Sequence, residues 1–114
     1  PETMRMLFLG DIFGRPGRAI VTQRLAGLRR DLGLTRIIAN AENASGGIGL
    51  TAKSARQLLE TGLDVLTGGN HIVRHRDILP FFETTDRLLR PANSPEGAPG
   101  VGFRVYRPTG KEPC

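Results

Sequence analysis

Five polar side chains in this sequence follow short apolar runs and could together bind metal. Asp11 follows MLFL, Glu42 and Asn43 lie in the stretch NAENASGG after RIIA, and Asn70 and His71 end the stretch VLTGGNH. A plain turn is well served by Asn, Ser and Gly, and it has no need of Glu42 beside Asn43. Two carboxylates that lie close together resist ionising at once unless a cation lies between them. The set therefore indicates a metal site.

The chemistry that such a site could perform is phosphoryl transfer to water. Oxygen ligands with one imidazole suit Mg²⁺, Mn²⁺, Fe or Zn²⁺ better than a metal that prefers thiolates. A bridging carboxylate can hold two ions about 3.5 to 4 Å apart, and such a pair generates hydroxide and clamps a phosphoryl group. Taken singly, Asp11 could be a cap, Asn70 part of a turn, and His71 a surface histidine. Two amides beside two acids exceed what a turn requires, so we favour the metal site.

The elements that position these residues alternate between strand and helix. Short apolar runs predict strands, and apolar residues at three- and four-residue spacing predict helices. The expected order is a strand at 5–9, a helix from Pro16 to Gly33, a strand at 36–40, a helix from Thr51 to Gly62, and a strand at 64–67. This alternation is the signature of parallel βαβ units, so we predict an α/β fold with a βαβαβ unit. The polar loops all follow strands and therefore share the edge where open α/β sheets bind ligands.

Further details of these elements can be predicted. The apolar face of the first helix is expected to comprise Ile20, Val21, Leu25, Leu28 and Leu32, and that of the second Ala55, Leu58 and Leu59. After the third strand, a short irregular helix is expected at 77–83, because Pro80 interrupts it. A long turn at 91–100 should lead to a last strand at 101–107, and 108–114 should be a tail.

Charge and composition favour a globular domain with anionic partners. The 114 residues carry a net charge of +5, and arginine supplies 14 of the 16 basic side chains. These arginines are scattered, and with no Trp and one Tyr the sequence has no aromatic ladder for stacking bases. The stretch GDIFGRPG lacks the G-x-G-x-x-G spacing, and no P-loop motif occurs, which disfavours dinucleotide binding.

The sequence also predicts a cellular compartment. Cys114 is the one cysteine, so no intrachain disulfide can form and a reducing compartment is the default. The apolar run near the start is too short for a signal peptide, and nothing approaches the roughly 20 apolar residues of a membrane span. We therefore expect a soluble, cytoplasmic protein without membrane association.

Four blocks of the sequence resemble a known family. LFLGDIFGRPGR (7–18), IIANAENASGGIGLT (37–51), GLDVLTGGNH (62–71) and RLLRPANSPEGAPG (87–100) resemble, in order, the YmdB-like branch of the calcineurin-like metallophosphoesterases. The resemblance implies a bacterial cytoplasmic phosphodiesterase with a dinuclear metal centre, acting on 2′,3′-cyclic nucleotides and similar phosphoesters. It also implies that the βαβαβ unit is the first half of an α/β/β/α sandwich.

The resemblance implies a role for each of the five polar residues. By motif, Asp11 would be a ligand to one metal, and Glu42 would bridge both. Asn43 would be a ligand or a phosphate contact, with Gly46 and Gly47 allowing the loop to bend inward. Asn70 would be a ligand to the second metal, and His71 the acid that protonates the leaving oxygen or holds the phosphate.

The sequence departs from the family pattern in three places. Phe13 stands where the wider superfamily has the His of GD-x-H-G, which is usual for this branch. Ile72-Val73-Arg74 follows the GNH motif, where the branch commonly has Thr or Ile and then Trp-Asp, and we interpret His75 as a surface residue. Family members are longer, and their second half supplies further histidines as ligands.

These departures lead to two expectations. Residues 1–114 should form one incomplete metallophosphoesterase domain, and the uncovered face of its sheet should cause self-association as a homo-oligomer. The leading hypothesis is phosphodiester hydrolysis by the intact protein, on a phosphoester substrate such as a cyclic nucleotide or RNA. The alternative is a truncated, non-catalytic fragment that binds phosphorylated ligands or RNA without turnover.

Overall fold

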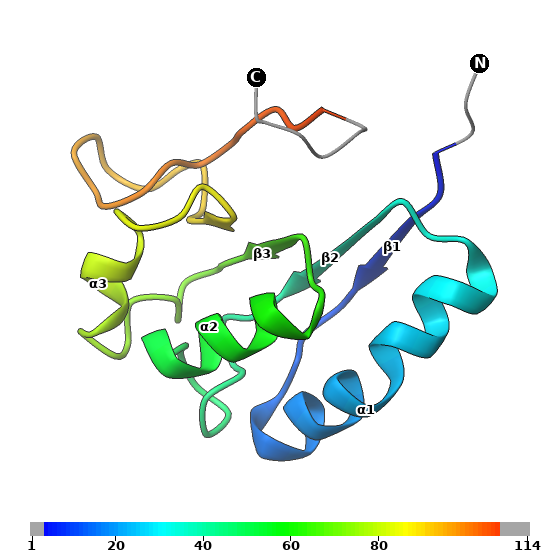
Figure 1. The fold of residues 1–114 in the computed structure, drawn as a ribbon. Coiled ribbons are helices and arrows are strands. Elements are labelled where there is room, and N and C mark those ends of the chain that lie inside the picture. Colours follow the sequence, from blue (N-terminus) through cyan, green and yellow to red (C-terminus); the bar gives the residue numbers. More distant parts are fainter. Residues whose placement is uncertain (1–3, 108–114) are drawn as a thin grey trace.

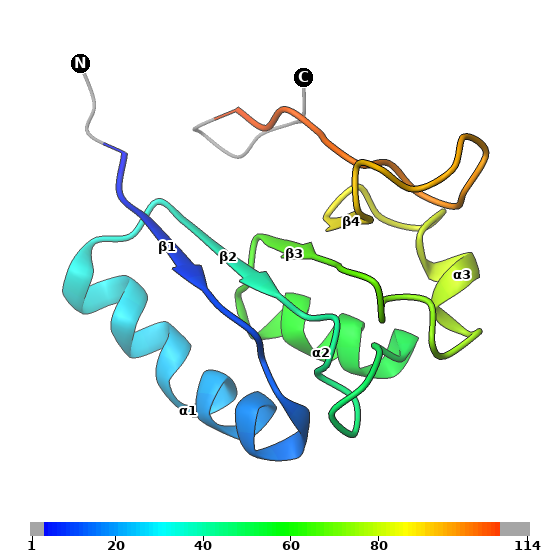
Figure 2. The ribbon, with the colours of Figure 1, turned by 180° about the vertical axis from the view of Figure 1, so that it is seen from behind.

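A four-stranded parallel sheet organises the protein, whose computed structural model describes residues 4–107 (Figures 1 and 2). The sheet order is β1-β2-β3-β4, and every neighbouring pair is parallel. The elements are β1 (Met6–Leu9), α1 (Gly14–Leu32), β2 (Arg36–Asn40), α2 (Ala52–Thr61), β3 (Val65–Thr67), α3 (Ile78–Phe81) and β4 (Leu88–Leu89). The predicted α/β fold with parallel βαβ units is therefore confirmed.

The two longer helices end where the sequence predicts. Gly33 follows α1 in the left-handed region, with a φ of 62°, a conformation that glycine adopts without steric cost. Thr51 caps α2, because its side-chain oxygen accepts a hydrogen bond from the Ser54 N–H at 3.2 Å. Gly62 follows the last turn of α2. α1 begins at Gly14, two residues before the predicted Pro16.

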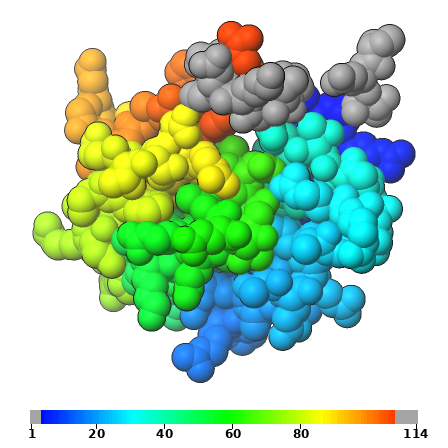
Figure 3. All heavy atoms as spheres, in the orientation of Figure 1, coloured from blue at the N-terminus to red at the C-terminus, as the bar shows by residue number. Residues whose placement is uncertain are grey.

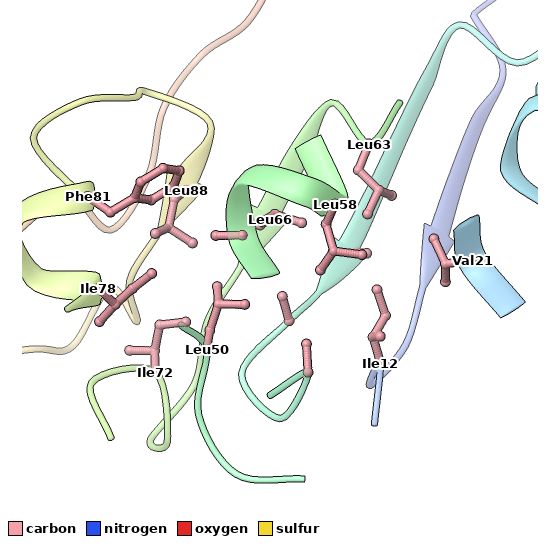
Figure 4. Close-up of a cluster of buried hydrophobic side chains, with 14 of the residues drawn as sticks. Ile12, Val21, Leu50, Leu58, Leu63, Leu66, Ile72, Ile78, Phe81 and Leu88 are labelled. Carbon is pink, nitrogen blue, oxygen red and sulfur yellow. The ribbon is translucent and has the colours of Figure 1, made fainter. Parts of the chain in front are cut away.

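The hydrophobic core lies between the helices and one face of the sheet (Figure 4). Ile37 and Ala39 on β2 and Leu66 on β3 are fully buried in it, together with Leu58 of α2. The side chains of α1, of α2 and of the segment that follows β3 cover this side of the molecule (Figure 3). Successive side chains along each strand therefore alternate, so that one set faces the helices and the other set faces away from them.

The predicted apolar face of α1 is only partly correct. Val21 and Leu25 are buried, whereas Ile20, Leu28 and Leu32 are exposed. α1 runs beside β1, which is the edge strand (Figure 1), so only a narrow stripe of the helix meets the core. In α2, Ala55 and Leu58 are buried and Leu59 packs against the core, as predicted.

The last part of the chain differs from the prediction. Leu88–Leu89 forms β4, which the sequence did not predict. In place of the expected strand at 101–107, the described residues have only isolated bridge residues at Val101, which pairs with Leu89, and at Tyr106. Phe103 and Val105 are exposed, so no second layer buries the apolar side of this segment. Pro80 does not prevent the short helix α3. The predicted tail at 108–114 lies outside the described residues.

The second face of the sheet carries exposed apolar side chains. Met6 and Phe8 on β1 point away from the helices, and the Phe8 side chain is 61% exposed. Phe8 is in register with Ile38, which in turn is in register with Val65. Among residues 4–107, no helix is long and apolar enough to cross a membrane.

Candidate active site at the carboxyl ends of the strands

Backbone hydrogen bonds tie the polar loops together beyond the ends of the strands. The Ile12 N–H donates to the Asn40 carbonyl at 3.1 Å, and the Gly14 N–H donates to the Asn43 carbonyl at 2.9 Å. On the other side of the same loop, the Ala41 N–H donates to the Thr67 carbonyl at 2.9 Å. The loop at 40–50 is therefore held between the loops that follow β1 and β3. This arrangement brings chemically active residues from three parts of the sequence to one edge.

The side chain of Asn43 links Asp11 to His71. Its amide nitrogen donates to both carboxylate oxygens of Asp11, at 3.1 Å each. Its amide oxygen lies 2.7 Å from Nδ1 of His71. Three of the five predicted residues thus form one continuous hydrogen-bonded chain.

This chain fixes which nitrogen of His71 carries the proton. An ionised carboxylate only accepts hydrogen bonds, so the NH₂ end of Asn43 must face Asp11. The amide oxygen then faces His71 and can only accept, so Nδ1 of His71 must be the donor. Nε2 is left without a partner in this chain and is available to a substrate. The His71 side chain is 42% exposed, so a ligand can reach it.

Glu42 lies beneath the loop that carries His71. One carboxylate oxygen accepts from the Asn40 side chain at 3.3 Å, and the other accepts from the His71 backbone N–H, also at 3.3 Å. A Cβ added at Gly69 would overlap this carboxylate, so only glycine leaves room for it. The Glu42 side chain is 17% exposed, and its Oε2 lies 3.9 Å from Nδ1 of His71. Glu42 is thus held in a fixed place beside the chain of Asp11, Asn43 and His71.

Glycines and an arginine shape the loop between Glu42 and α2. Gly46 and Gly47 have φ values of 68° and 90°, which side-chain-bearing residues rarely adopt, so the predicted bend at these two glycines is present. The Arg18 guanidinium donates to the Ala44 carbonyl and so ties the loop to α1. Arg18 is therefore engaged in holding the loop.

Asn70 differs from the other four predicted residues. Its side chain is exposed and makes no hydrogen bond within residues 4–107. Its backbone follows Gly69, which lies against Glu42, so Asn70 still borders the same cluster. The structure therefore joins Asp11, Glu42, Asn43 and His71 through hydrogen bonds and places Asn70 at their margin.

The donor set suits a hard divalent cation but does not complete a site for one. Carboxylate and amide oxygens with an imidazole are ligands for Mg²⁺, Mn²⁺, Fe or Zn²⁺. Within the part of the chain that the structure describes, however, no group of three His, Cys, Asp or Glu side chains is placed to hold a metal ion. A catalytic zinc site, for comparison, typically uses three protein ligands.

Two contributors were missed by sequence reasoning. Asn40 orients Glu42 at both ends, because its side-chain oxygen also accepts from the Glu42 N–H at 3.2 Å. The signal was an Asn two residues before Glu42, a spacing at which Asn side chains bond to the following backbone. The second is Gly69, whose lack of a side chain admits the Glu42 carboxylate.

The structure also shows what steadies His71 in the absence of the usual Trp-Asp pair. The Asn43 amide oxygen bonds to its Nδ1, as described above. His75, which the sequence suggested was a surface residue, is partly buried and faces the Ile48 carbonyl with Nε2 at 3.0 Å. His75 therefore supports the glycine-rich loop.

The chain is similar to known proteins in sequence and in fold. A family model described as YmdB-like protein matches residues 7–113. The chain is 41% identical over 109 residues to a 2′,3′-cyclic-nucleotide 2′-phosphodiesterase of Bacillus subtilis, in an alignment that covers 96% of this chain and 41% of that protein.

Two solved structures share the fold. One, described as a novel phosphatase from Mycoplasma pneumoniae, aligns with a TM-score of 0.84 and 31% identity over 93% of this chain and 40% of its own. The other, a hypothetical protein from Thermus thermophilus, aligns with a TM-score of 0.83 and 37% identity over 93% of this chain and 41% of its own. The chain thus spans about two fifths of the length of these three proteins. On the family match and the shared fold, this chain belongs to the YmdB-like family.

Proposed function

We propose that the protein is a metal-dependent phosphodiesterase that hydrolyses 2′,3′-cyclic nucleotides or similar phosphoesters. The observation that carries this proposal is the cluster of Asp11, Glu42, Asn43 and His71, joined by hydrogen bonds at the ligand-binding edge of a parallel sheet. The Bacillus subtilis relative supports the choice of substrate, because its name describes this reaction. As a member of this enzyme class, the protein would be cytoplasmic.

We infer that two divalent ions, of Fe, Mn, Zn or Mg, belong to this site. Asp11 would bind one ion, Asn70 the other, and Glu42 both, while Asn43 would bind an ion or the phosphate. When bound, such ions polarise the phosphoryl group and lower the pKa of bound water so that hydroxide forms near neutral pH. The remaining ligands would come from residues outside this cluster, since the described residues do not complete a site.

The protein's own residues would position the substrate and move one proton. In its doubly protonated form, His71 would donate the Nε2 proton to the leaving oxygen and return to the neutral ring that keeps its proton on Nδ1, the nitrogen that Asn43 engages. Asp11 would keep Asn43 in this orientation by accepting both hydrogen bonds of the amide nitrogen. Asn40 and Gly69 would set the place of the Glu42 carboxylate.

Hydrolysis of 2′,3′-cyclic AMP with added Mn²⁺ tests this proposal. We expect the intact protein to hydrolyse the nucleotide, and Glu42→Gln to lower its kcat/KM at least about 100-fold, since even residues that only support a metal ligand cost 10- to 100-fold when changed. Glu60→Gln is the matched control, because Glu60 is exposed on α2 and takes no part in the cluster. Equal activity of Glu42→Gln and wild type would contradict the proposal. Binding of the nucleotide without any turnover would instead support the alternative of a non-catalytic fragment.

A further inference from the structure

Phe13 is a large aromatic residue that the active-site cluster leaves exposed. The residue is 61% exposed, and it lies in the loop that carries Asp11. A single exposed apolar residue is normal on a protein surface, so the place of this ring beside Asp11 matters more than its exposure. The proposed hydrolysis of a phosphate group assigns no part to this ring.

One face of the Phe13 ring rests on Gly47. A Cβ added at Gly47 would lie 2.8 Å from Cζ of the ring, and 3.2 and 3.4 Å from the two neighbouring ring carbons. The three distances are similar, which is expected for an approach onto the face of the ring and not onto its edge. Any side chain at position 47 would therefore push the ring away. Since the side chain is nonetheless more than half exposed, the opposite face of the ring is open to solvent.

The ring stands beside the cluster and not at a distance from it. Phe13 is two residues after Asp11, so their Cα atoms are at most about 7 Å apart. The next residue, Gly14, donates its N–H to the Asn43 carbonyl at 2.9 Å. The loop that supports the ring also carries Glu42 and Asn43. The position of the ring is thus fixed by the same loops that form the phosphate site.

We propose that the open face of Phe13 is the stacking platform for the base of a nucleotide substrate. This inference rests on the proposed function and extends it, because it selects nucleotides over phosphoesters that lack a base. In a nucleoside 2′,3′-cyclic phosphate, only the ribose separates the base from the phosphate, so a ring beside the phosphate site can meet the base. Every base has a π-face, so stacking binds all four bases with modest preference.

Calorimetric titration of the protein with Mn²⁺ present measures binding alone, and so gives a test that does not depend on turnover. The probes are 3′-AMP and inorganic phosphate, and the variants are Phe13→Leu, Phe13→Trp and Phe103→Leu. We expect Phe13→Leu to weaken the binding of 3′-AMP about 5- to 150-fold, the range measured for the loss of one stacked base, and to leave phosphate binding unchanged. Phe13→Trp should bind 3′-AMP at least as tightly as wild type. Phe103→Leu should change neither affinity, because Phe103 is an exposed ring on the distant segment 101–107.

Three results would contradict the proposal that Phe13 stacks on the base. One is equal affinity of wild type and Phe13→Leu for 3′-AMP. Another is that Phe13→Leu weakens the binding of 3′-AMP and the binding of phosphate by the same factor, which would mean that the ring only supports the loop. The third is wild-type protein that binds 3′-AMP no more tightly than phosphate. If base-dependent binding is found but no cyclic nucleotide is hydrolysed, the proposed function fails and the platform stands.

Discussion

At the scale of single residues, Asn43 determines which nitrogen of His71 carries a proton. An amide has distinct donor and acceptor ends, and here the carboxylate of Asp11 determines which end faces His71. A carboxylate in place of Asn43 would accept from His71 equally well but would repel Asp11. The neutral side chain therefore orients the imidazole without adding negative charge to a site that already holds two acids.

Substitution of His71 tests its role as the proton donor. We expect His71→Gln to lower kcat for 2′,3′-cyclic AMP by about 10²- to 10⁴-fold, the usual contribution of a positioned acid or base. The value of KM should change little, because the substituted side chain remains polar and of similar reach. His75→Gln is the control, since His75 contacts the Ile48 carbonyl and not the cluster. A kcat for His71→Gln equal to that of the control would exclude this role.

Tyr106 gives a pH dependence of stability that is independent of the site. Its hydroxyl donates to the Asp86 carbonyl. Burial raises the pKa of the phenol above its ordinary value of 10.0, and Asp86 raises it further, while Arg104 and Arg87 act in the opposite direction. The folded protein thus favours the neutral phenol. This contribution is complete below pH 10 and is lost as the pH rises through the pKa of the folded state.

Urea unfolding of wild type and Tyr106→Phe at several pH values checks this expectation. Near pH 8 the variant should lose about 1 kcal/mol of unfolding free energy, the net worth of one hydrogen bond. Above pH 10 the difference between the two proteins should shrink, because only wild type carries the phenol. A difference that stays constant from pH 8 to pH 11 would contradict the raised pKa.

At the scale of elements, the parallel ladder is what gathers the site. β1, β2 and β3 end in register, and backbone bonds continue between the loops that follow them. Side chains 30 residues apart in sequence therefore become neighbours. The loops must also pack closely against one another. Gly69 allows this because it has no side chain at the point where its backbone passes the Glu42 carboxylate.

Gly69→Ala should displace the Glu42 carboxylate while leaving the fold intact. The added methyl group would overlap a flexible carboxylate end, which can move away at little cost in stability. We expect a loss of activity of about 10- to 100-fold, as for other residues that orient a metal ligand, with nearly unchanged thermal unfolding. Gly10→Ala is the matched control, because a Cβ there meets no atom within 4 Å. Full activity of Gly69→Ala would show that the position of Glu42 is unimportant.

The sequence predicts these elements well where a strong local signal exists. The strand at 36–40, the cap at Thr51 and the glycines at 33 and 62 agree with the structure. β4 was missed because it is only two residues long and depends on pairing with β3. The strand expected at 101–107 has the right alternation of side chains, but it lacks a layer to bury its apolar side.

The sequence predicted which residues lie together at the candidate site, but it did not predict which of their atoms form hydrogen bonds. The rule that parallel strands end at one edge was enough to place Asp11, Glu42, Asn43 and His71 together. Which atoms bond depends on the path of the loop at 40–50, whose bends at Gly46 and Gly47 have no local pattern that fixes them. The link from Asn43 to His71 therefore became visible only in three dimensions.

At the scale of the whole molecule, the structure is thin, measuring 39 × 33 × 20 Å. Within residues 4–107 the helices cover one side of the sheet only (Figure 1). On the other side, Met6 and Phe8 expose apolar surface that a stable domain ordinarily buries against a second layer. The predicted association of this chain with itself follows from the same surface and stays a prediction.

Light scattering coupled to gel filtration tests whether this face drives association. We expect the 114-residue chain to form dimers or larger species, and Phe8→Ser to shift it toward the monomer, because the substitution removes the most exposed apolar side chain of the sheet. Ile20→Ser is the control, since Ile20 is similarly exposed but lies on α1, on the opposite side of the sheet. A wild-type chain that is monomeric at high concentration would contradict the expectation.

We propose that the loops at the strand ends hold catalytic metal ions for phosphoester hydrolysis. A crystal structure of the protein grown with Mn²⁺, with anomalous diffraction data, would show whether these loops bind metal. We predict anomalous peaks within about 2.0 to 2.6 Å of carboxylate oxygens of Asp11 and Glu42, the range for divalent cations bound by oxygen. Peaks that lie elsewhere, with both carboxylates free of metal, would contradict the account.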